Sequence, residues 1–396
     1  MKLLPILLIA LLGTAEVVSQ TNSLFFAKKS GDVLYIAKKY DSANDIIYTF
    51  DKCMANELYT FRYVALYSNS ADSINENVTR PYSTMILNAN STDNIGPVGL
   101  LIDQVGYWIG GNHVYTDSLG TSHRTAYTKS VEIMIGETVY NDDFETYTDT
   151  LKINVENALY YPISLPEQVE CISENVEYAI DKSGINVNLS HDILENMTIV
   201  VYYGLQTVYN TTLFKKIFIS NSQHSGELDF ANGIYSGAIS DFPDVYKVRL
   251  SNSEKSFCQE MVLDTRHGLF AETSAYINPL SSYSRIFTSS GKTYFTQIRN
   301  KAVIKGESYF WKGRYSWYNS NEFSTLQPED INIICNLTEN YIYWNDSVSA
   351  LSYNIYRSID PYSGFSLIGT STTTSYTDSD ISGSNKYFYK VTAVNQ

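Results

Sequence analysis

Residue types that commonly carry out chemistry are present in this chain of 396 residues, but they form no recognised catalytic pattern. The nucleophile elbow GxSxG, the Walker A loop, the zinc motif HExxH, the dinucleotide motif GxGxxG and the EF-hand loop are all missing. No two histidines have the i, i+2 or i, i+4 spacing that places two imidazoles on one face of a strand or helix. We therefore predict no catalytic residue, no metal site and no cofactor.

Acidic residues are frequent, and glycosidases need two carboxylates about 5 to 10 Å apart on either side of a sugar. A pair such as Glu227 and Asp229 can be nominated among the 42 Asp and Glu residues, but nothing distinguishes it from other pairs. Acidic runs at 41–45, 141–145 and 378–380 would suit calcium, although ordinary turns have the same composition. A secreted polysaccharide-active enzyme is therefore the lowest-ranked of three interpretations.

The richest aromatic stretch, residues 309–318, suggests a binding site instead. In it Trp311, Tyr315 and Trp317 would form a flat platform for a sugar ring, with Arg314 as a hydrogen-bonding fork. The same period-two pattern also fits a core strand with one exposed aromatic face. The platform describes a carbohydrate-binding surface adhesin with extracellular glycans as partners, which is the first alternative function.

Composition and charge narrow the class of protein. The formal net charge is −14, which argues against nucleic acid or an anionic membrane surface as a partner because both need basic patches. The 34 tyrosines and only 18% charged residues are typical of an aromatic, β-rich extracellular protein. Beyond the leader, no stretch approaches the roughly 20 apolar residues needed to span a bilayer, so we expect no membrane partner.

Residues 1–19 have the layout of a secretory signal peptide. Lys2 precedes an apolar run over 3–12, and small residues follow at Gly13, Ala15 and Ser19. The mature protein would begin at Glu16 or Gln20 and be extracellular, either secreted or part of a cell-surface filament.

Secretion has two covalent consequences. One or two disulfides are expected, with three possible pairings and free core thiols as the alternative, among Cys53, Cys171, Cys258 and Cys335. Sequons of the form Asn-x-Ser/Thr predict a glycoprotein with surface glycans at Asn77, Asn90, Asn188, Asn196, Asn210, Asn336 and Asn345.

Strand-like runs separated by turn-rich segments dominate the chain, and helical periodicity is weak. We predict an all-β protein of tandem β-sandwich domains. The proline-rich segment 161–166 marks the expected boundary between a domain at 20–165 and a second β-rich domain at 166–327. A third, immunoglobulin-like domain is expected at 328–396.

The third domain resembles the fibronectin type III family. Trp344 lies in a strand-like YIYW segment at the position of the core tryptophan of the family, and residues 381–387 have its apolar-x-x-Gly-x-x-Tyr spacing. The resemblance implies that Tyr387 is the tyrosine-corner residue and that 388–395 forms strand F. Strand G of the family has no counterpart, so the module is expected to be incomplete.

An exposed strand edge rarely stays bare in natural proteins. A strand from another subunit, a strand returned from elsewhere in this chain and a truncated sequence are the three explanations. The first predicts a structural protein that polymerises with itself head to tail into a filament. Its expected acceptor residues are Trp344, Ile355, Tyr387, Tyr389 and Val391. The expected donor residues, which otherwise read as ordinary first strands, are Leu24, Phe25, Phe26, Val33 and Tyr35.

A second resemblance is shorter. Residues 107–113 (YWIGGNH) and 124–133 are similar to segments of uncharacterised phage-tail and bacterial surface β-sandwich proteins. This similarity carries no known chemistry, so filament assembly and cell adhesion remain the leading hypotheses.

Overall fold

The computed structural model describes most of the chain after the expected leader. The described residues are 24–77, 84–88, 95–162, 169–208, 213–220, 225–229, 237–238, 245–264, 268–270, 287–289, 292–321, 328, 331–336, 338–382 and 386–394. They form strands and a short 3-10 turn, η5 (Gly268–Phe270), and no α-helix occurs among them. The protein is therefore all-β, as the alternation of apolar and polar residues predicts.

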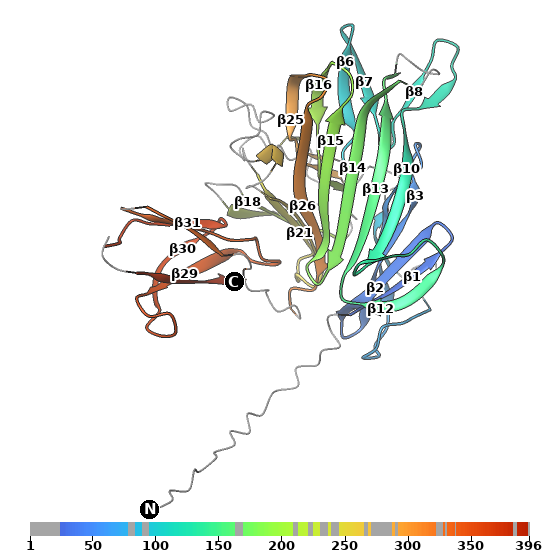
Figure 1. Cartoon of the computed structure of the whole chain (residues 1–396). Coiled ribbons are helices and arrows are strands. Elements are labelled where there is room, and N and C mark those ends of the chain that lie inside the picture. The colour runs from blue at the N-terminus through green and yellow to red at the C-terminus, as the bar shows by residue number, and fades with distance from the viewer. Residues whose placement is uncertain are drawn as a thin grey trace, which may run out of the picture.

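A ten-stranded antiparallel sheet forms the largest layer (Figure 1). In order across the sheet its strands are β11 (Thr138–Val139), β10 (Ala126–Ile135), β13 (Leu151–Tyr160), β14 (Glu170–Asp181), β15 (Gly184–Ile193), β26 (Ser308–Tyr318), β22 (Cys258–Leu263), β21 (Lys247–Ser251), β18 (Lys216–Ser220) and β19 (Ser225–Asp229). Buried residues alternate with half-buried or exposed ones in its central strands β14 and β15, whereas β21 and β22 are buried throughout.

Smaller sheets pack with the ten-stranded sheet, and we call these sheets together, from β1 to β26, the large body. A six-stranded sheet contains β12 (Phe144–Thr148), β1 (Phe25–Ser30), β2 (Val33–Asp41), β3 (Asn44–Cys53), β4 (Leu58–Ser68) and β5 (Thr84–Asn88). A four-stranded sheet contains β25 (Ile298–Val303), β16 (Met197–Tyr202), β6 (Val98–Ile102) and β7 (Val105–Ile109). Another contains β17 (Gln206–Val208), β24 (Lys292–Tyr294), β23 (Phe287–Ser289) and β20 (Gly237–Ala238), and a hairpin joins β8 (Val114–Thr116) to β9 (Ser122–Arg124).

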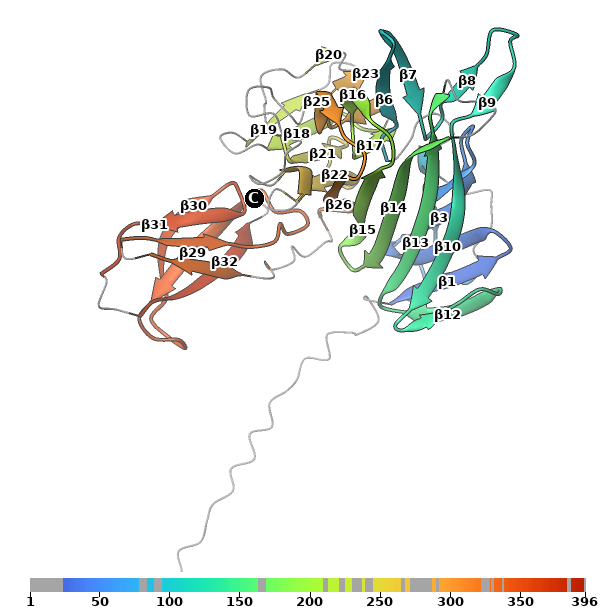
Figure 2. The same ribbon diagram turned by 45° about the horizontal axis from the view of Figure 1, so that its top comes forward.

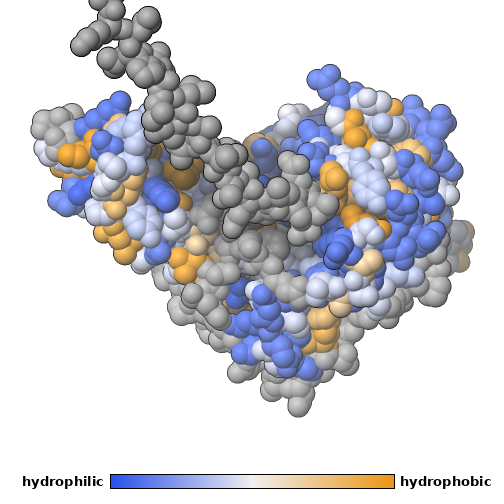
Figure 3. All heavy atoms as spheres, turned by 90° about the horizontal axis from the view of Figure 1, so that it is seen from below, coloured by the Kyte–Doolittle hydropathy of each residue, from blue (hydrophilic) through white to orange (hydrophobic). Residues whose placement is uncertain are grey.

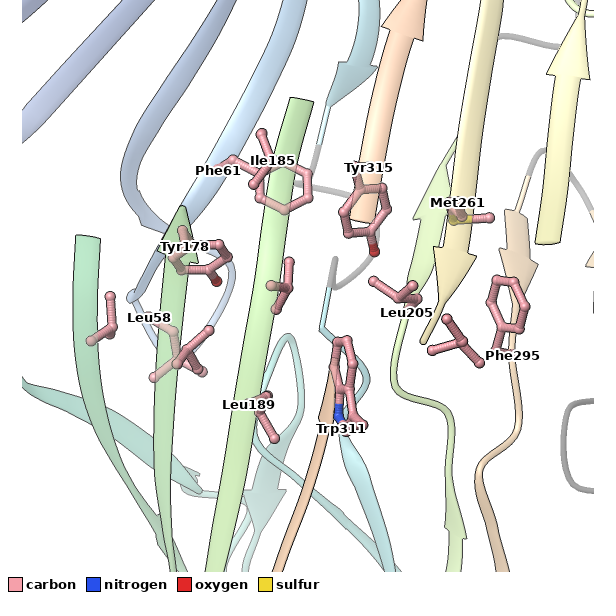
Figure 4. Packing of buried hydrophobic residues seen from close by; sticks show 14 of the residues in the cluster. Leu58, Phe61, Tyr178, Ile185, Leu189, Leu205, Met261, Phe295, Trp311 and Tyr315 are labelled. Atoms are coloured by element: carbon pink, nitrogen blue, oxygen red, sulfur yellow. The ribbon is translucent and has the colours of Figure 1, made fainter. Parts of the chain in front are cut away.

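Aromatic contacts join these layers across one hydrophobic core (Figure 4). Phe61 of β4 packs edge-on against Tyr178 of β14 and Tyr315 of β26, with ring centroids 6.1 and 5.0 Å apart. Trp311 of β26 donates a hydrogen bond of 2.7 Å from Nε1 to the Tyr202 hydroxyl of β16. The core is therefore continuous from the six-stranded sheet to the four-stranded sheet.

This continuity changes the expected domain division. Residues 20–165 and 166–327 were predicted to be separate domains, but β13 and β14 are hydrogen-bonded neighbours in one sheet, with Val155 opposite Val176. The segment 161–166, part of which lies outside the described residues, connects two adjacent strands. The large body is therefore one packed unit, because its hydrophobic core includes side chains from Phe25 to Trp317.

A single glycine position shows how tightly the sheet is packed at the β14–β15 turn. Gly184 has φ of +130°, and a Cβ atom there would lie 2.1 Å from the carbonyl oxygen of Tyr315. Only glycine fits this position without a shift of the neighbouring backbone.

The C-terminal residues form a separate small sandwich beside the large body (Figure 2). One sheet contains β27 (Asn332–Cys335), β28 (Asn340–Tyr343) and β31 (Ser375–Asp378), and the other contains β30 (Ser366–Ser371), β29 (Ser352–Ser358) and β32 (Phe388–Val394). Its core is made of Ile342, Trp344, Ala350, Tyr353, Ile355 and Val391. We call residues 331–394 the C-terminal module.

Among the described residues there is no helix with the length and apolar character that a membrane span requires.

Candidate functional site

The expected donor strand is fully used within the large body. The backbone of β1 pairs with β12 on one side and with β2 on the other. Phe25 and Phe26 are buried, Val33 and Tyr35 of β2 are half-buried, and only Leu24, just before β1, is exposed. Donating this segment would break two strand ladders and expose core side chains, so in this structure residues 24–38 serve as first strands of the large body rather than as a free donor.

The expected acceptor residues have different positions in the module. Trp344, Ile355 and Val391 are buried core residues and do not line an open groove. The Tyr387 hydroxyl accepts a hydrogen bond of 2.9 Å from the backbone N–H of Ser382, five residues upstream, which is the tyrosine-corner contact. Tyr389 donates from its hydroxyl to Asp378 at 2.7 Å and thereby connects the two sheets.

The module has an open margin between its two sheets. Within the described residues β32 pairs only with β29, and β27 pairs only with β28. Ile333 of β27 lies opposite the buried Ile342 and is nevertheless 41% exposed. The view from below shows orange, apolar surface on this module (Figure 3). Ile334, Leu367 and Ile331, which precedes the first strand, are further exposed apolar residues of the module.

The proposed aromatic platform lies inside the protein. Trp311, Tyr315 and Trp317 point into the core of the large body and are at most 3% exposed (Figure 4). The opposite face of β26 carries Phe310, which is 43% exposed, and the half-buried Arg314. The prediction of an aromatic sugar-stacking surface is therefore wrong, because the other face of the strand is the exposed one.

The expected disulfides are not formed. No disulfide joins any of the four cysteines; Cys53, Cys171 and Cys258 are buried, and Cys335 is exposed on β27. Burial raises the pKa of the Cys258 thiol to about 11, with the nearby Arg249 acting in the opposite direction. Three of the four cysteines are therefore core thiols outside any disulfide, which is the alternative to the expected pairing.

Four of the sequon asparagines, Asn77, Asn188, Asn196 and Asn336, are exposed. Asn345 is half-buried, and Asn90 and Asn210 lie outside the described residues. Asn77, Asn196 and Asn336 are open to glycans, whereas Asn188 and Asn345 both line a cleft where the module meets the large body.

A buried cluster of four charged side chains joins the C-terminal module to the outer face of the ten-stranded sheet. Arg314 of β26 contacts Asp346 of the module at 3.0 Å, and Lys247 of β21 contacts the same carboxylate at 3.1 Å. Glu260 of β22 lies 3.6 Å from the Lys247 ammonium and 3.5 Å from the Arg314 guanidinium. Two cations and two anions therefore compensate one another at this junction.

Further hydrogen bonds complete the cluster. Lys247 donates to the carbonyl oxygen of Ala350 at 2.8 Å, and Tyr353 donates to Asp346 at 2.9 Å. Burial by itself lowers the pKa of Arg314, but Asp346 and Glu260 outweigh this effect and the pKa is raised above its ordinary value. The guanidinium is therefore permanently charged, and we call these four charged residues the docking cluster.

A cleft of about 420 Å³ opens beside the docking cluster. Its floor is the outer face of β14, β15 and β26, and its wall is the loop at 344–348 of the module together with Tyr246 and Thr374. Its volume lies in the range of small-molecule sites. The residues come from segments far apart in the sequence, so sequence patterns did not indicate this site.

A second polar arrangement that sequence reasoning missed crosses the inner face of the sheet. Thr128, Asn157, Glu174 and His191 lie on four successive strands, joined by hydrogen bonds of 2.7, 2.9 and 2.8 Å. Asn157, Glu174 and His191 are buried. Each side chain is hydrogen-bonded to its neighbour in the row, as buried polar groups generally are, so we interpret this row as structural. Polar residues at inward positions of β13, β14 and β15 were the available signal.

His113 and His123, the two histidines that a hairpin could have brought together, have different partners. His123 lies 2.9 Å from Asp117 on the β8–β9 hairpin, whereas the ring of His113 stacks on Trp108. In the part of the chain that the structure describes, no group of three or more His, Cys, Asp or Glu could hold a metal ion.

Lys38 of β2 gives a prediction about pH. Its ammonium lies 5.8 Å from the ring centroid of Phe25 and 5.7 Å from that of Tyr48, and burial lowers its pKa to about 8 against the opposing charge of Asp181. Below that pH the folded protein holds a desolvated charge, so we expect Lys38→Met to raise the free energy of unfolding at pH 7. The gain should be about 2 kcal/mol, because cation–π attraction offsets part of the desolvation cost.

The pH dependence follows from the sign of this shift. Between pH 8 and 10.5 the unfolded lysine still holds a proton that the folded lysine has lost, so the wild-type protein gains stability as the pH rises. Denaturant unfolding at pH 7, 9 and 10.5 should show the advantage of Lys38→Met shrinking over this range. A constant difference would contradict the assignment.

No known family profile matches the chain, and no curated protein matches it in sequence. Solved structures that resemble it include the galactosidase domain of the alpha-galactosidase–sucrose kinase AgaSK, with 10% identity and a TM-score of 0.37 over 72% of this chain and 40% of that one. An alpha-galactosidase from Lactobacillus brevis has 10% identity and a TM-score of 0.38 over 72% and 39%. The GH36 alpha-galactosidase AgaB from Geobacillus stearothermophilus has 10% identity and a TM-score of 0.34 over 77% and 41%.

This chain thus spans about two fifths of the length of these structures. The similarity is too low to transfer an activity to it.

Proposed function

We propose that this chain is a secreted, glycosylated structural protein that assembles with copies of itself by strand addition at the C-terminal module. The observation that carries the proposal is the open margin at β32, a seven-residue strand with a single charged side chain, Lys390, which among the described residues pairs on one side only. Long, apolar edges of this kind associate with other strands. The exposed Ile333 lies at the margin that an added strand would cover.

The donor differs from the one expected from sequence, because β1 and β2 are internal strands of the six-stranded sheet. We infer that the donor is instead a strand edge of a second copy. Pairing of β32 with β32 of another copy gives a closed dimer, whereas pairing with a different edge gives an open filament.

A charge on the edge tests the proposal. Thr392→Lys adds a second positive charge beside Lys390 on the outer side of β32, and like charges along an edge oppose strand pairing. We expect light scattering after size exclusion at tens of micromolar to show assemblies for the wild-type protein and monomers for the variant.

The matched control is Asn354→Lys, since Asn354 lies directly opposite Thr392 on β29, which has neighbours on both sides. This variant should assemble like the wild-type protein. A wild-type protein that is monomeric at all concentrations, or assembly that survives Thr392→Lys, would refute strand addition.

A further inference from the structure

The cleft beside the docking cluster has nearly balanced charge. Its acidic lining residues are Glu177, Asp181, Asp264 and Asp346, and its basic ones are Lys182, Lys312 and Arg314. Arg314 and Asp346 form an ion pair with each other, and Asp181 accepts hydrogen bonds from Ser183 and Asn186. The cleft therefore favours neither an anion nor a cation strongly.

The polar groups that line the cleft include both hydrogen-bond donors and hydrogen-bond acceptors. The amide of Asn188 offers donors and an acceptor, Lys312 offers a donor and Glu177 an acceptor, whereas the Asn186 amide N–H groups are already donated to Asp181 and its neighbours. Glu177, Asn188 and Lys312 lie in one row across β14, β15 and β26, because Glu177 is opposite Asn188 and Asn188 is opposite Lys312. Sugar hydroxyls, which both donate and accept, match such a row.

The shape of the cleft leaves room against the sheet. Ala179 places only a methyl group on the floor and is half-buried. The wall is fixed because Asp346 is held by Lys247 and Arg314 from the opposite side. A preformed site loses less conformational entropy on binding.

From these features we propose that the cleft is a binding site for a neutral, polyhydroxylated ligand, namely a short uncharged oligosaccharide. The site differs from the aromatic platform expected from sequence, since its contacts are hydrogen bonds from the outer face of the sheet. It is separate from the β32 edge and does not depend on assembly.

The test measures binding of neutral trisaccharides of glucose, mannose and galactose by saturation-transfer NMR and titration calorimetry. A sulfated and a sialylated oligosaccharide serve as charged comparators. Because Asn188 faces the cleft, the protein is made without N-glycans. We expect at least one neutral trisaccharide to bind, with an affinity reduced at least tenfold by Ala179→Phe, which fills the floor, and also reduced by Lys312→Ala.

Ser173→Phe is the matched control, because Ser173 is a half-buried residue on the same face of β14 and does not line the cleft. This variant should bind as the wild-type protein does. Absence of binding by every neutral trisaccharide, binding of only the charged comparators, or unchanged affinity in both Ala179→Phe and Lys312→Ala would overturn the proposal. Monomeric protein suffices for the test, so failure of assembly would not affect its outcome.

Discussion

Asp346→Ala is expected to release the C-terminal module from the large body. The change leaves Lys247 and Arg314 buried against Glu260 alone, with one uncompensated positive charge. Breaking a buried ion pair by removing one partner typically costs about 3 to 5 kcal/mol. Small-angle X-ray scattering should show a larger radius of gyration than for the wild-type protein, and denaturant unfolding should separate into two transitions.

Asp360→Ala is the matched control for this experiment. Asp360 belongs to the same module, and its carboxylate accepts hydrogen bonds from Tyr362 and Ser363 of its own loop. Its replacement should leave the radius of gyration unchanged. If Asp346→Ala also left both the scattering and the unfolding curve unchanged, the docking cluster would not hold the module.

Trp311→Ala is expected to destabilise the whole large body. The side chain is 1% exposed and is the hydrogen-bond donor to Tyr202, so its removal leaves a cavity and takes away that partner. Truncating a buried tryptophan costs about 3 to 5 kcal/mol. The midpoint of chemical unfolding should fall accordingly.

The neighbouring Phe310→Ala separates this effect from that of a surface residue. Phe310 is 43% exposed, so its loss should lower the free energy of unfolding by about 1 kcal/mol or less. A Trp311→Ala protein that kept wild-type stability but lost glycan binding would instead support the hypothesis that these aromatic residues form a sugar-binding platform.

The strand at Ser308–Tyr318 illustrates what the sequence could predict. Its period-two pattern correctly indicates a strand and separates its two faces. The pattern cannot say which face is buried, because Trp311, Tyr315 and Trp317 suit either a core or a binding surface. Neighbouring strands decide this question, and those neighbours are Gly184–Ile193 and Cys258–Leu263, far away in the chain.

Strand pairing also explains why the expected domain boundary at 161–166 does not separate two domains. Prolines at 162 and 166 are typical of a linker, yet the strands on either side of this segment pair with each other. The docking cluster and the cleft are each built from segments far apart in the chain, so local spacing carries no information about them. Local patterns were sufficient for the tyrosine corner, because Tyr387 contacts Ser382 only five residues away.

The loop that carries Asp346 belongs to two packed units simultaneously. Trp344 and Ala350, at its two ends, lie in the core of the C-terminal module, whereas Val348 packs with Cys258 and Tyr318 of the large body. Each set of contacts therefore restrains the loop geometry that the other set needs. In the wild-type protein we expect folding of the small sandwich and its attachment to the large body to be coupled, and loss of the Asp346 carboxylate to weaken that coupling.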